Sequence, residues 1–76
     1  MRRIYPPAAY KRVALLLREH IEAGLYRPGE KLPTITELAE LHDIKPGASF
    51  EALLLLVAEG IVVPRRGDGY YVKETA

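Results

Sequence analysis

Two helix start signals that follow each other closely in the middle of the chain restrict its fold most. Thr34 and Glu37 form a Thr-x-x-Glu pattern, in which the threonine caps a helix and the glutamate reaches back to the amide of the cap. Pro46 suits the first position of another helix, because a proline there loses no backbone hydrogen bond, and Gly60 suits its end. Only a tight turn at residues 43–45 joins the two helices. The sequence therefore predicts helices at residues 34–42 and 46–59, which form a helix-turn-helix unit.

Apolar spacing adds one helix before this unit and a hairpin after it. Apolar side chains recur between Ala8 and Ala23 at the spacing of one helix face, which predicts a helix with one buried side. A short strand fits Lys31 and Leu32. Two further runs, 61–63 and 70–72, predict the strands of a hairpin whose turn spans 65–69. We expect the inward faces of the helices to be formed by Tyr10, Val13, Ala14, Leu17 and Ile21, by Ile35, Leu38, Ala39 and Leu41, and by Ser49, Ala52, Leu53 and Leu56.

These elements predict an α+β fold, a winged helix-turn-helix with three helices and a small antiparallel β-hairpin as its wing. A chain of 76 residues makes one domain, and a domain of this size buries only about 60 to 65% of the surface that its unfolded form exposes. Its free energy of unfolding is therefore expected to be small. We expect residues 8–73 to form the domain and residues 1–7 to be a flexible N-terminal arm.

The composition excludes several kinds of function. Without a cysteine, the chain has no disulfide, no thiolate zinc site and no cysteine nucleophile. His20 and His42 fit no metal-binding spacing, and no nucleophile, base and orienting group stand at a spacing suited to catalysis. We therefore expect no enzyme, no cofactor, no metal and no small-molecule effector site. The longest apolar run, 52–58, is too short to span a bilayer, and Pro6 and Pro7 interrupt any secretory signal, so we expect a cytoplasmic protein.

The positively charged residues are grouped, although the net charge of +1 is too small to indicate nucleic acid. Arg65 and Arg66 fall on the predicted wing next to Gly67 and Gly69, which let a backbone approach a partner closely. This arrangement favours contacts with DNA phosphates over a turn that is only solvated, although the glycines could equally serve turn geometry. A second group near the N-terminus could form a basic arm over DNA or be solvated: Arg2, Arg3, Lys11 and Arg12.

From Tyr10 to Val72 the chain resembles the DNA-binding domain of the GntR family of bacterial regulators. The matching stretches are Ile21 to Gly24, Pro28-Gly29-Glu30-Lys31-Leu32-Pro33-Thr34, Glu37-Leu38-Ala39, Ala52-Leu53 with Leu56, Glu59-Gly60-Ile61, and Gly67-Asp68-Gly69-Tyr70-Tyr71-Val72. The resemblance implies a winged helix whose third helix contacts operator DNA as part of a symmetric dimer. Family members usually add a C-terminal effector domain, so we expect either a protein without a ligand sensor or a fragment of a longer one.

Departures from the family pattern fall on the helices that are expected to meet DNA. The family usually carries an arginine at the position of Thr36, and its third helix usually begins Ser-Arg-x-Thr-Val-Arg where this chain has Lys45 to Phe50. Leu54 and Leu55 stand at positions that are often basic, so the third helix has lost nearly every cation. We still expect DNA contacts at the second helix, at the start of the third helix and on the wing, through Thr34, Thr36, Lys45, Gly47, Ser49, Phe50, Arg65, Arg66, Gly67, Gly69 and Tyr70.

Three interpretations of the apolar third helix are open. Phe50, Leu54 and Leu55 lie outside its inward face and could form a dimer or partner surface. Alternatively, Phe50 contacts a thymine methyl group or wedges at bases, while polar residues at the helix start supply hydrogen bonds. In the third interpretation Leu55 and Val57 pack on the first helix and the wing, which leaves only Phe50 and Leu54 exposed.

The sequence thus predicts a DNA-binding transcription regulator of GntR-like winged-helix type that binds double-stranded DNA as a homodimer. One alternative is a winged helix used for protein–protein interaction through its third helix. The other is a DNA-architectural factor of a phage or plasmid. No interaction with a membrane is expected.

Overall fold

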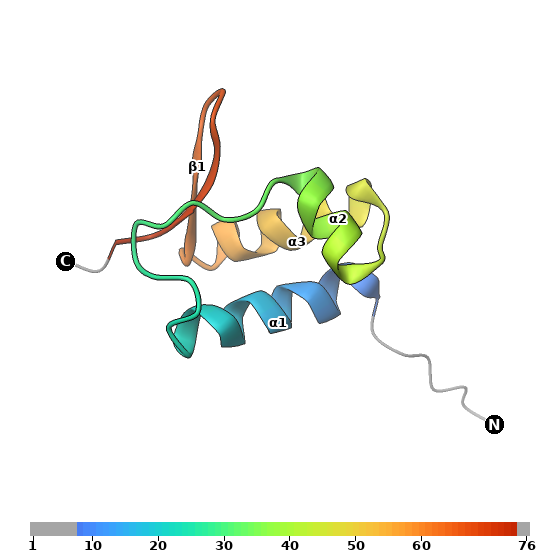
Figure 1. Cartoon of the computed structure of the whole chain (residues 1–76), viewed down its shortest axis with the longest axis horizontal. Coiled ribbons are helices and arrows are strands. Elements are labelled where there is room, and N and C mark those ends of the chain that lie inside the picture. The colour runs from blue at the N-terminus through green and yellow to red at the C-terminus, as the bar shows by residue number, and fades with distance from the viewer. Residues whose placement is uncertain (1–7, 75–76) are drawn as a thin grey trace.

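Three helices and one β-hairpin make up the fold, in the order that the sequence predicts. The computed structural model describes residues 8–74 and contains α1 (Ala9–Glu22), α2 (Ile35–His42), α3 (Pro46–Ala58), β1 (Val62–Arg65) and β2 (Gly69–Val72). Both α1 and α2 pack against α3, and the hairpin stands out from the helices as a wing (Figure 1). The α+β winged helix-turn-helix is confirmed, whereas the arm predicted at residues 1–7 lies outside the described residues. None of the helices in residues 8–74 is long and apolar enough to cross a membrane.

The helix α2 begins and ends where its sequence signals lie. Thr34 Oγ1 accepts a hydrogen bond from the Glu37 backbone amide at 3.1 Å, and Glu37 Oε1 accepts one from the Thr34 amide at 2.8 Å. The hydrogen bonds with Thr34, first of all that from its amide, lower the pKa of Glu37 below its ordinary value. Asp43 ends the helix at φ 52°, a left-handed conformation that aspartate tolerates. The predicted cap and turn are therefore confirmed.

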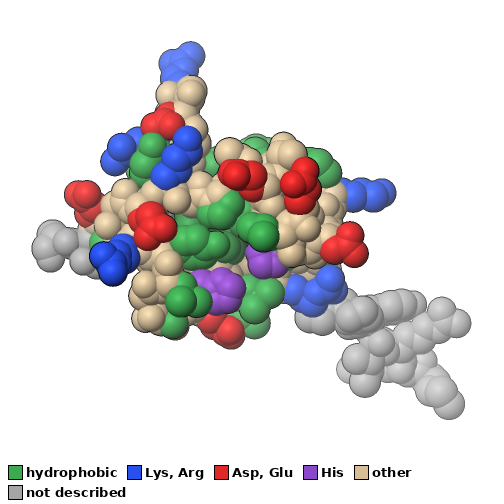
Figure 2. Space-filling model, viewed as in Figure 1, with side chains coloured by type: hydrophobic (Ala, Val, Ile, Leu, Met, Phe, Trp, Pro, Cys, Tyr) green, Lys and Arg blue, Asp and Glu red, His purple; other side chains and the backbone are tan. Residues whose placement is uncertain are grey.

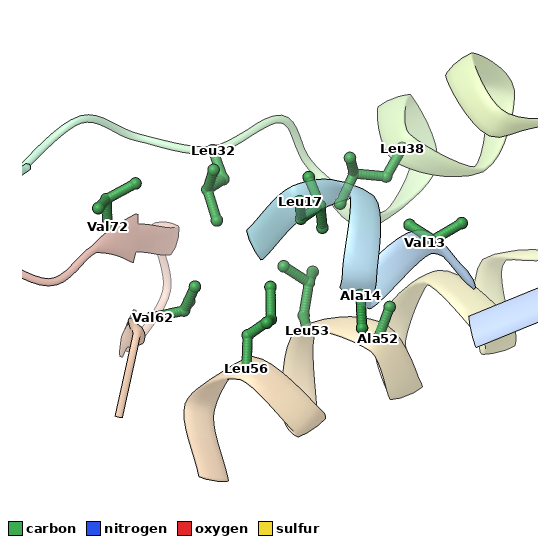
Figure 3. Packing of buried hydrophobic residues seen from close by; sticks show 10 residues of the cluster. All are labelled: Val13, Ala14, Leu17, Leu32, Leu38, Ala52, Leu53, Leu56, Val62 and Val72. Carbon is green, nitrogen blue, oxygen red and sulfur yellow. The ribbon is translucent and has the colours of Figure 1, made fainter. Parts of the chain in front are cut away.

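One apolar core lies between the helices and the base of the wing. Figure 3 shows Leu17 of α1, Leu38 of α2 and Leu53 of α3 around one centre, with Leu32 and Val62 on the side toward the wing. Each of these five side chains is at most 2% exposed. Burying a side chain of this kind contributes about 1.5–3 kcal/mol, so the core holds the helices and the base of the wing together as one unit.

The sequence wrongly predicts that the side chain of Leu41 faces inward. Its side chain is 66% exposed, whereas Leu38 and Ala39 of the same helix are buried. The helix has only eight residues and turns one narrow face toward α3, and Leu41, two positions after Ala39, lies about 200° around the helix from it. Leu41 instead lines an open hollow with Tyr26 and Pro33, between α2 and the segment that precedes it.

The base of the wing is paired with a third piece of chain. The strands β1 and β2 run antiparallel, with Arg65 opposite Gly69. Residues 29–32 run along the other edge of β2, where the Leu32 amide donates a hydrogen bond to the Tyr70 carbonyl at 2.8 Å. The Gly29 amide donates to the Val72 carbonyl, and the Val72 amide to the Glu30 carbonyl, each at 2.9 Å.

Two details of the wing differ from the sequence prediction. Lys31 forms a single antiparallel bridge with Tyr71, in place of the predicted short strand. Because Arg65 and Gly69 are paired with each other, they belong to the strands, and the turn is limited to residues 66–68. The wing is therefore longer and its tip is tighter than the sequence predicts.

Replacing Thr34 with alanine is expected to destabilise the protein. The change removes the hydroxyl that accepts the Glu37 amide, and the loss of such a cap costs about 1 kcal/mol of the free energy of unfolding. Urea unfolding followed by circular dichroism measures this difference. Thr36→Ala is the matched control, because Thr36 is exposed and its side chain makes no hydrogen bond within residues 8–74. Equal stability of the two variants would contradict the capping role.

Candidate nucleic-acid interface

Most of the residues predicted to contact DNA line two shallow hollows that adjoin on the wing. The first hollow is lined by Pro64, Arg65, Arg66, Gly67, Gly69 and Tyr70. The second lies between the wing and the start of α2, and its lining includes Lys31, Thr34, Thr36, Asp68, Gly69 and Tyr70. Because Gly69 and Tyr70 line both hollows, the wing and the start of α2 form one continuous surface.

The wing carries positive charge away from the body of the protein. Figure 2 shows side chains of the Lys and Arg type on the projecting hairpin and at its end. Arg66 is exposed in the turn, and within residues 8–74 it forms no ion pair or hydrogen bond. Arg65 is positioned, because its guanidinium carbon lies 4.0 Å from the centroid of the Tyr71 ring, within the range of cation–π attraction. The wing therefore offers one unengaged arginine and one that is held in place.

Two glycines of the wing are required by its backbone conformation. Gly67 has φ 74° and Gly69 has φ 147°, and residues that carry a Cβ rarely adopt these values. A Cβ added at Gly69 would also lie 3.1 Å from Cε of Lys31, so the stem of this lysine passes close to the wing backbone. A Cβ at Gly67 would meet nothing within 4 Å. Backbone conformation alone thus explains both glycines, and of the two only Gly67 borders open space.

Ser49 is buried, which confirms its predicted place on the inward face of the third helix and corrects its prediction as a DNA contact. Its side chain is fully buried, and its Oγ donates a hydrogen bond to the carbonyl of Ile35 at 2.9 Å. A buried hydroxyl without a partner would destabilise the fold, so this bond satisfies the serine within the protein. It also fastens α3 to the start of α2, next to Thr34 and Thr36. The role of Ser49 is to hold the two helices of the helix-turn-helix together.

The start of α3 forms a separate region of the candidate interface. Lys45 and Gly47 are exposed, as predicted, but they line neither of the two hollows. Lys45 precedes the helix and is exposed, so its ammonium group can reach a partner. The hydrogen bond of Ser49 keeps this region against the start of α2.

The exposed side of α3 carries apolar residues and Glu51, and it carries no cation. No Lys, Arg or His occurs in residues 46–64. Phe50 is 42% exposed and Leu54 is 45% exposed, and their spacing of one helical turn places them on the same face. Leu55 and Val57 are only partly exposed and pack against the core. Packing of these two residues within the protein agrees with the third interpretation, and the exposed large apolar residues of α3 outside its inward face are Phe50 and Leu54.

A cluster of charged and aromatic side chains on the wing is not predicted from the sequence. Asp68 accepts hydrogen bonds from Lys31 Nζ at 3.1 Å and from the Tyr71 hydroxyl at 2.5 Å. Arg65 lies over the ring of the same tyrosine. Lys31 reaches this cluster because it is paired with Tyr71 across the edge of β2, and no local pattern in the sequence reveals that pairing.

Within this cluster the charge of Lys31 is offset by that of Asp68. The hydrogen bond with Asp68 raises the pKa of Lys31. The Tyr71 hydroxyl first, and Lys31 second, lower the pKa of Asp68 by hydrogen bonding to its carboxylate. The hydrogen bond between Tyr71 and Asp68 also raises the pKa of Tyr71. Lys31 and Asp68 are therefore both charged near neutral pH. Their side chains are 45% and 47% exposed.

Most polar groups of the two hollows suit a binding surface for an anion. They are guanidinium and ammonium groups, threonine hydroxyls, a tyrosine and glycine backbone, and the carboxylate of Asp68 is the exception. Across residues 8–74, no three His, Asp or Glu side chains gather in a way that could hold a metal ion.

Residues 9–72 match the family model for bacterial regulatory proteins of the gntR family. Over 67 residues the chain is 39% identical to the Uxu operon transcriptional regulator of Escherichia coli (strain K12). This alignment covers 88% of the chain and 26% of the relative. The chain spans about a quarter or less of the length of the first curated relatives that it matches.

Two solved structures show the same fold. YtrA from Sulfolobus acidocaldarius, a GntR-family transcription factor, is 36% identical with a TM-score of 0.81, over 88% of this chain and 70% of that one. The DNA-binding domain of AraR, in complex with the operator ORX1, is 26% identical with a TM-score of 0.82. That match covers 91% of this chain and 81% of the AraR chain.

Proposed function

This chain belongs to the gntR family of bacterial regulatory proteins, and on that premise we propose that it binds double-stranded DNA as a transcription regulator. The observation that carries the proposal is the continuous surface formed by the wing and the start of α2, which brings arginines, hydroxyls and glycine backbone together. The AraR domain, which has the same fold, is bound to an operator. The Uxu operon relative is a regulator of transcription, and the proposal includes no catalysis.

The wing supplies the contacts with DNA phosphates. Arg66 extends from the exposed turn, and Arg65 is already oriented by the Tyr71 ring, so little freedom is lost when it meets a phosphate. Thr36 adds a hydroxyl that is unused within residues 8–74, whereas the Thr34 hydroxyl already caps α2. Such contacts fix the position of the protein on the duplex and contribute affinity that falls with salt.

The start of α3 supplies contacts with base edges. The commonest specific contact, a bidentate Arg or Lys on guanine, is not available from residues 46–64, which contain neither residue. Phe50 is exposed on this helix and suits the methyl group of thymine, with Lys45 close to the helix start. Base recognition through α3 therefore rests on apolar contact more than on charge.

We also propose that two copies bind together in the cytoplasm, where bacterial DNA lies. Helix-turn-helix dimers place their recognition helices about 34 Å apart in successive major grooves and recognise palindromic sites. With few wing cations in each copy, a dimer doubles the number of phosphates that the protein can neutralise.

Replacing Arg65 and Arg66 together with alanine tests the wing. We expect weaker binding to every duplex sequence, and a slope of log K against log salt that is shallower by up to about 1.8, or about 0.9 for each phosphate that is no longer neutralised. Fluorescence anisotropy of a labelled mixed-sequence duplex at several salt concentrations measures both. The control variant Arg27→Ala with Lys73→Ala removes the same charge from exposed positions outside the two hollows.

If the wing variant and the control lower affinity and slope equally, only net charge matters and the role of the wing is wrong. If the parent protein shows no salt-sensitive binding, the proposal of DNA binding fails as a whole.

The exposed pair Phe50 and Leu54 favours a second candidate function, in which α3 contacts a protein partner. The variant Phe50→Ala separates the two functions. If Phe50 contacts thymine, the variant loses affinity for a duplex selected from a random pool. Replacing thymine with uracil in that duplex, which removes the methyl group, then weakens the parent and leaves the variant unchanged.

Unchanged duplex binding by Phe50→Ala, together with a changed oligomeric state in sedimentation, would assign this face to protein contact instead. Leu16→Ala is a suitable control, because Leu16 is a similarly exposed apolar residue of α1.

A further inference from the structure

A carboxylate occupies the part of the candidate surface where a DNA phosphate would be expected. Asp68 lines the hollow between the wing and α2, together with Thr36 and Lys31. Both of its carboxylate oxygens are used, since Oδ1 accepts from the Lys31 ammonium at 3.1 Å and Oδ2 accepts from the Tyr71 hydroxyl at 2.5 Å. Two acceptor oxygens on an anion make the contacts that a phosphate makes with lysine and hydroxyl donors.

The lysine that Asp68 engages is placed on the wing in advance. The Lys31 backbone is bridged to Tyr71, and the stem of its side chain passes over Gly69, with Cε 3.1 Å from where a Cβ would stand. Its ammonium group is therefore presented at the hollow. A chain of contacts connects this group with Arg65, running from Lys31 through Asp68 and Tyr71.

The pair formed by Lys31 and Asp68 is accessible to solvent and to a ligand. Their side chains are 45% and 47% exposed. An exposed ion pair of this kind is weak and is screened by salt, so it does little for the stability of the fold. Its main effect is on the charge that the hollow presents to a polyanion.

We propose that Asp68 is a built-in competitor for the DNA phosphate, because its carboxylate engages Lys31 and so withholds this cation from the DNA backbone. The inference rests on the proposed DNA-binding function and refines it. With Lys31 neutralised, the wing contacts phosphates through Arg65 and Arg66, and affinity for DNA of any sequence is kept low. Removing the negative charge of Asp68 releases Lys31 to bind one more phosphate.

The variant Asp68→Asn tests the proposal, since the amide keeps the shape of the side chain and loses its charge. We expect tighter binding to a mixed-sequence duplex, and a slope of log K against log salt that is steeper by about 0.9, the contribution of one phosphate. Asp43→Asn is the matched control. Asp43 is exposed outside both hollows, its φ of 52° suits asparagine, and the substitution changes the net charge by the same amount.

The double variant Lys31→Ala with Asp68→Asn identifies the released cation, because its net charge equals that of the parent. We expect it to return to the slope of the parent protein. Circular dichroism and thermal unfolding of each variant show that the fold is kept.

Three results would overturn the proposal: equal slopes for Asp68→Asn and Asp43→Asn, weaker binding by Asp68→Asn, or a steeper slope that persists in the double variant. In each of these cases the parent protein still binds DNA with salt dependence, so only the competitor role of Asp68 fails. If the parent itself does not bind, the proposed function fails first.

Discussion

Backbone hydrogen bonds between residues 29–32 and β2 determine where the wing stands. A two-stranded hairpin by itself is only marginally stable in water. Pairing its base with a third piece of chain extends the sheet and joins the wing to the segment that leads into α2. This pairing creates the hollow between the wing and α2, and it brings Lys31 within hydrogen-bonding distance of Asp68. The pairing therefore fixes the position of the wing relative to the start of α2.

The candidate surface divides its chemistry between two regions. The wing carries the cations, with Arg65 held against an aromatic ring and Arg66 unengaged within residues 8–74. The helix α3 contributes an apolar face and no cation beyond Lys45 at its start. Under the proposed function, affinity for the phosphate backbone comes from the wing, and discrimination between bases comes from apolar contact or from the shape of the duplex. The buried bond of Ser49 fixes α3 to the start of α2, and the pairing of residues 29–32 with β2 fixes the wing to the segment that leads into α2.

Local signals in the sequence predict the fold well, because caps, proline and glycine act within a few residues. The capping box at Thr34, the turn at Asp43 and the start of α3 at Pro46 lie where these signals place them. The candidate site is harder to predict, because it depends on contacts between distant segments. The sequence assigns Ser49 both to the inward face and to the DNA contacts, and only its hydrogen bond to Ile35 shows which role holds. The cluster around Asp68 depends on a pairing that no local pattern indicates.

The most direct test of the account is a titration of the ¹⁵N-labelled protein with a mixed-sequence duplex at about 50 mM salt, followed through backbone amide chemical shifts. If the wing, the start of α2 and the start of α3 form one DNA-binding surface, the largest changes occur at residues 34–36, 45–50 and 65–70. The loop after α1, around Leu25, stays unchanged. Changes confined to that loop or to the hollow around Leu41, or no change on the wing, would contradict the account.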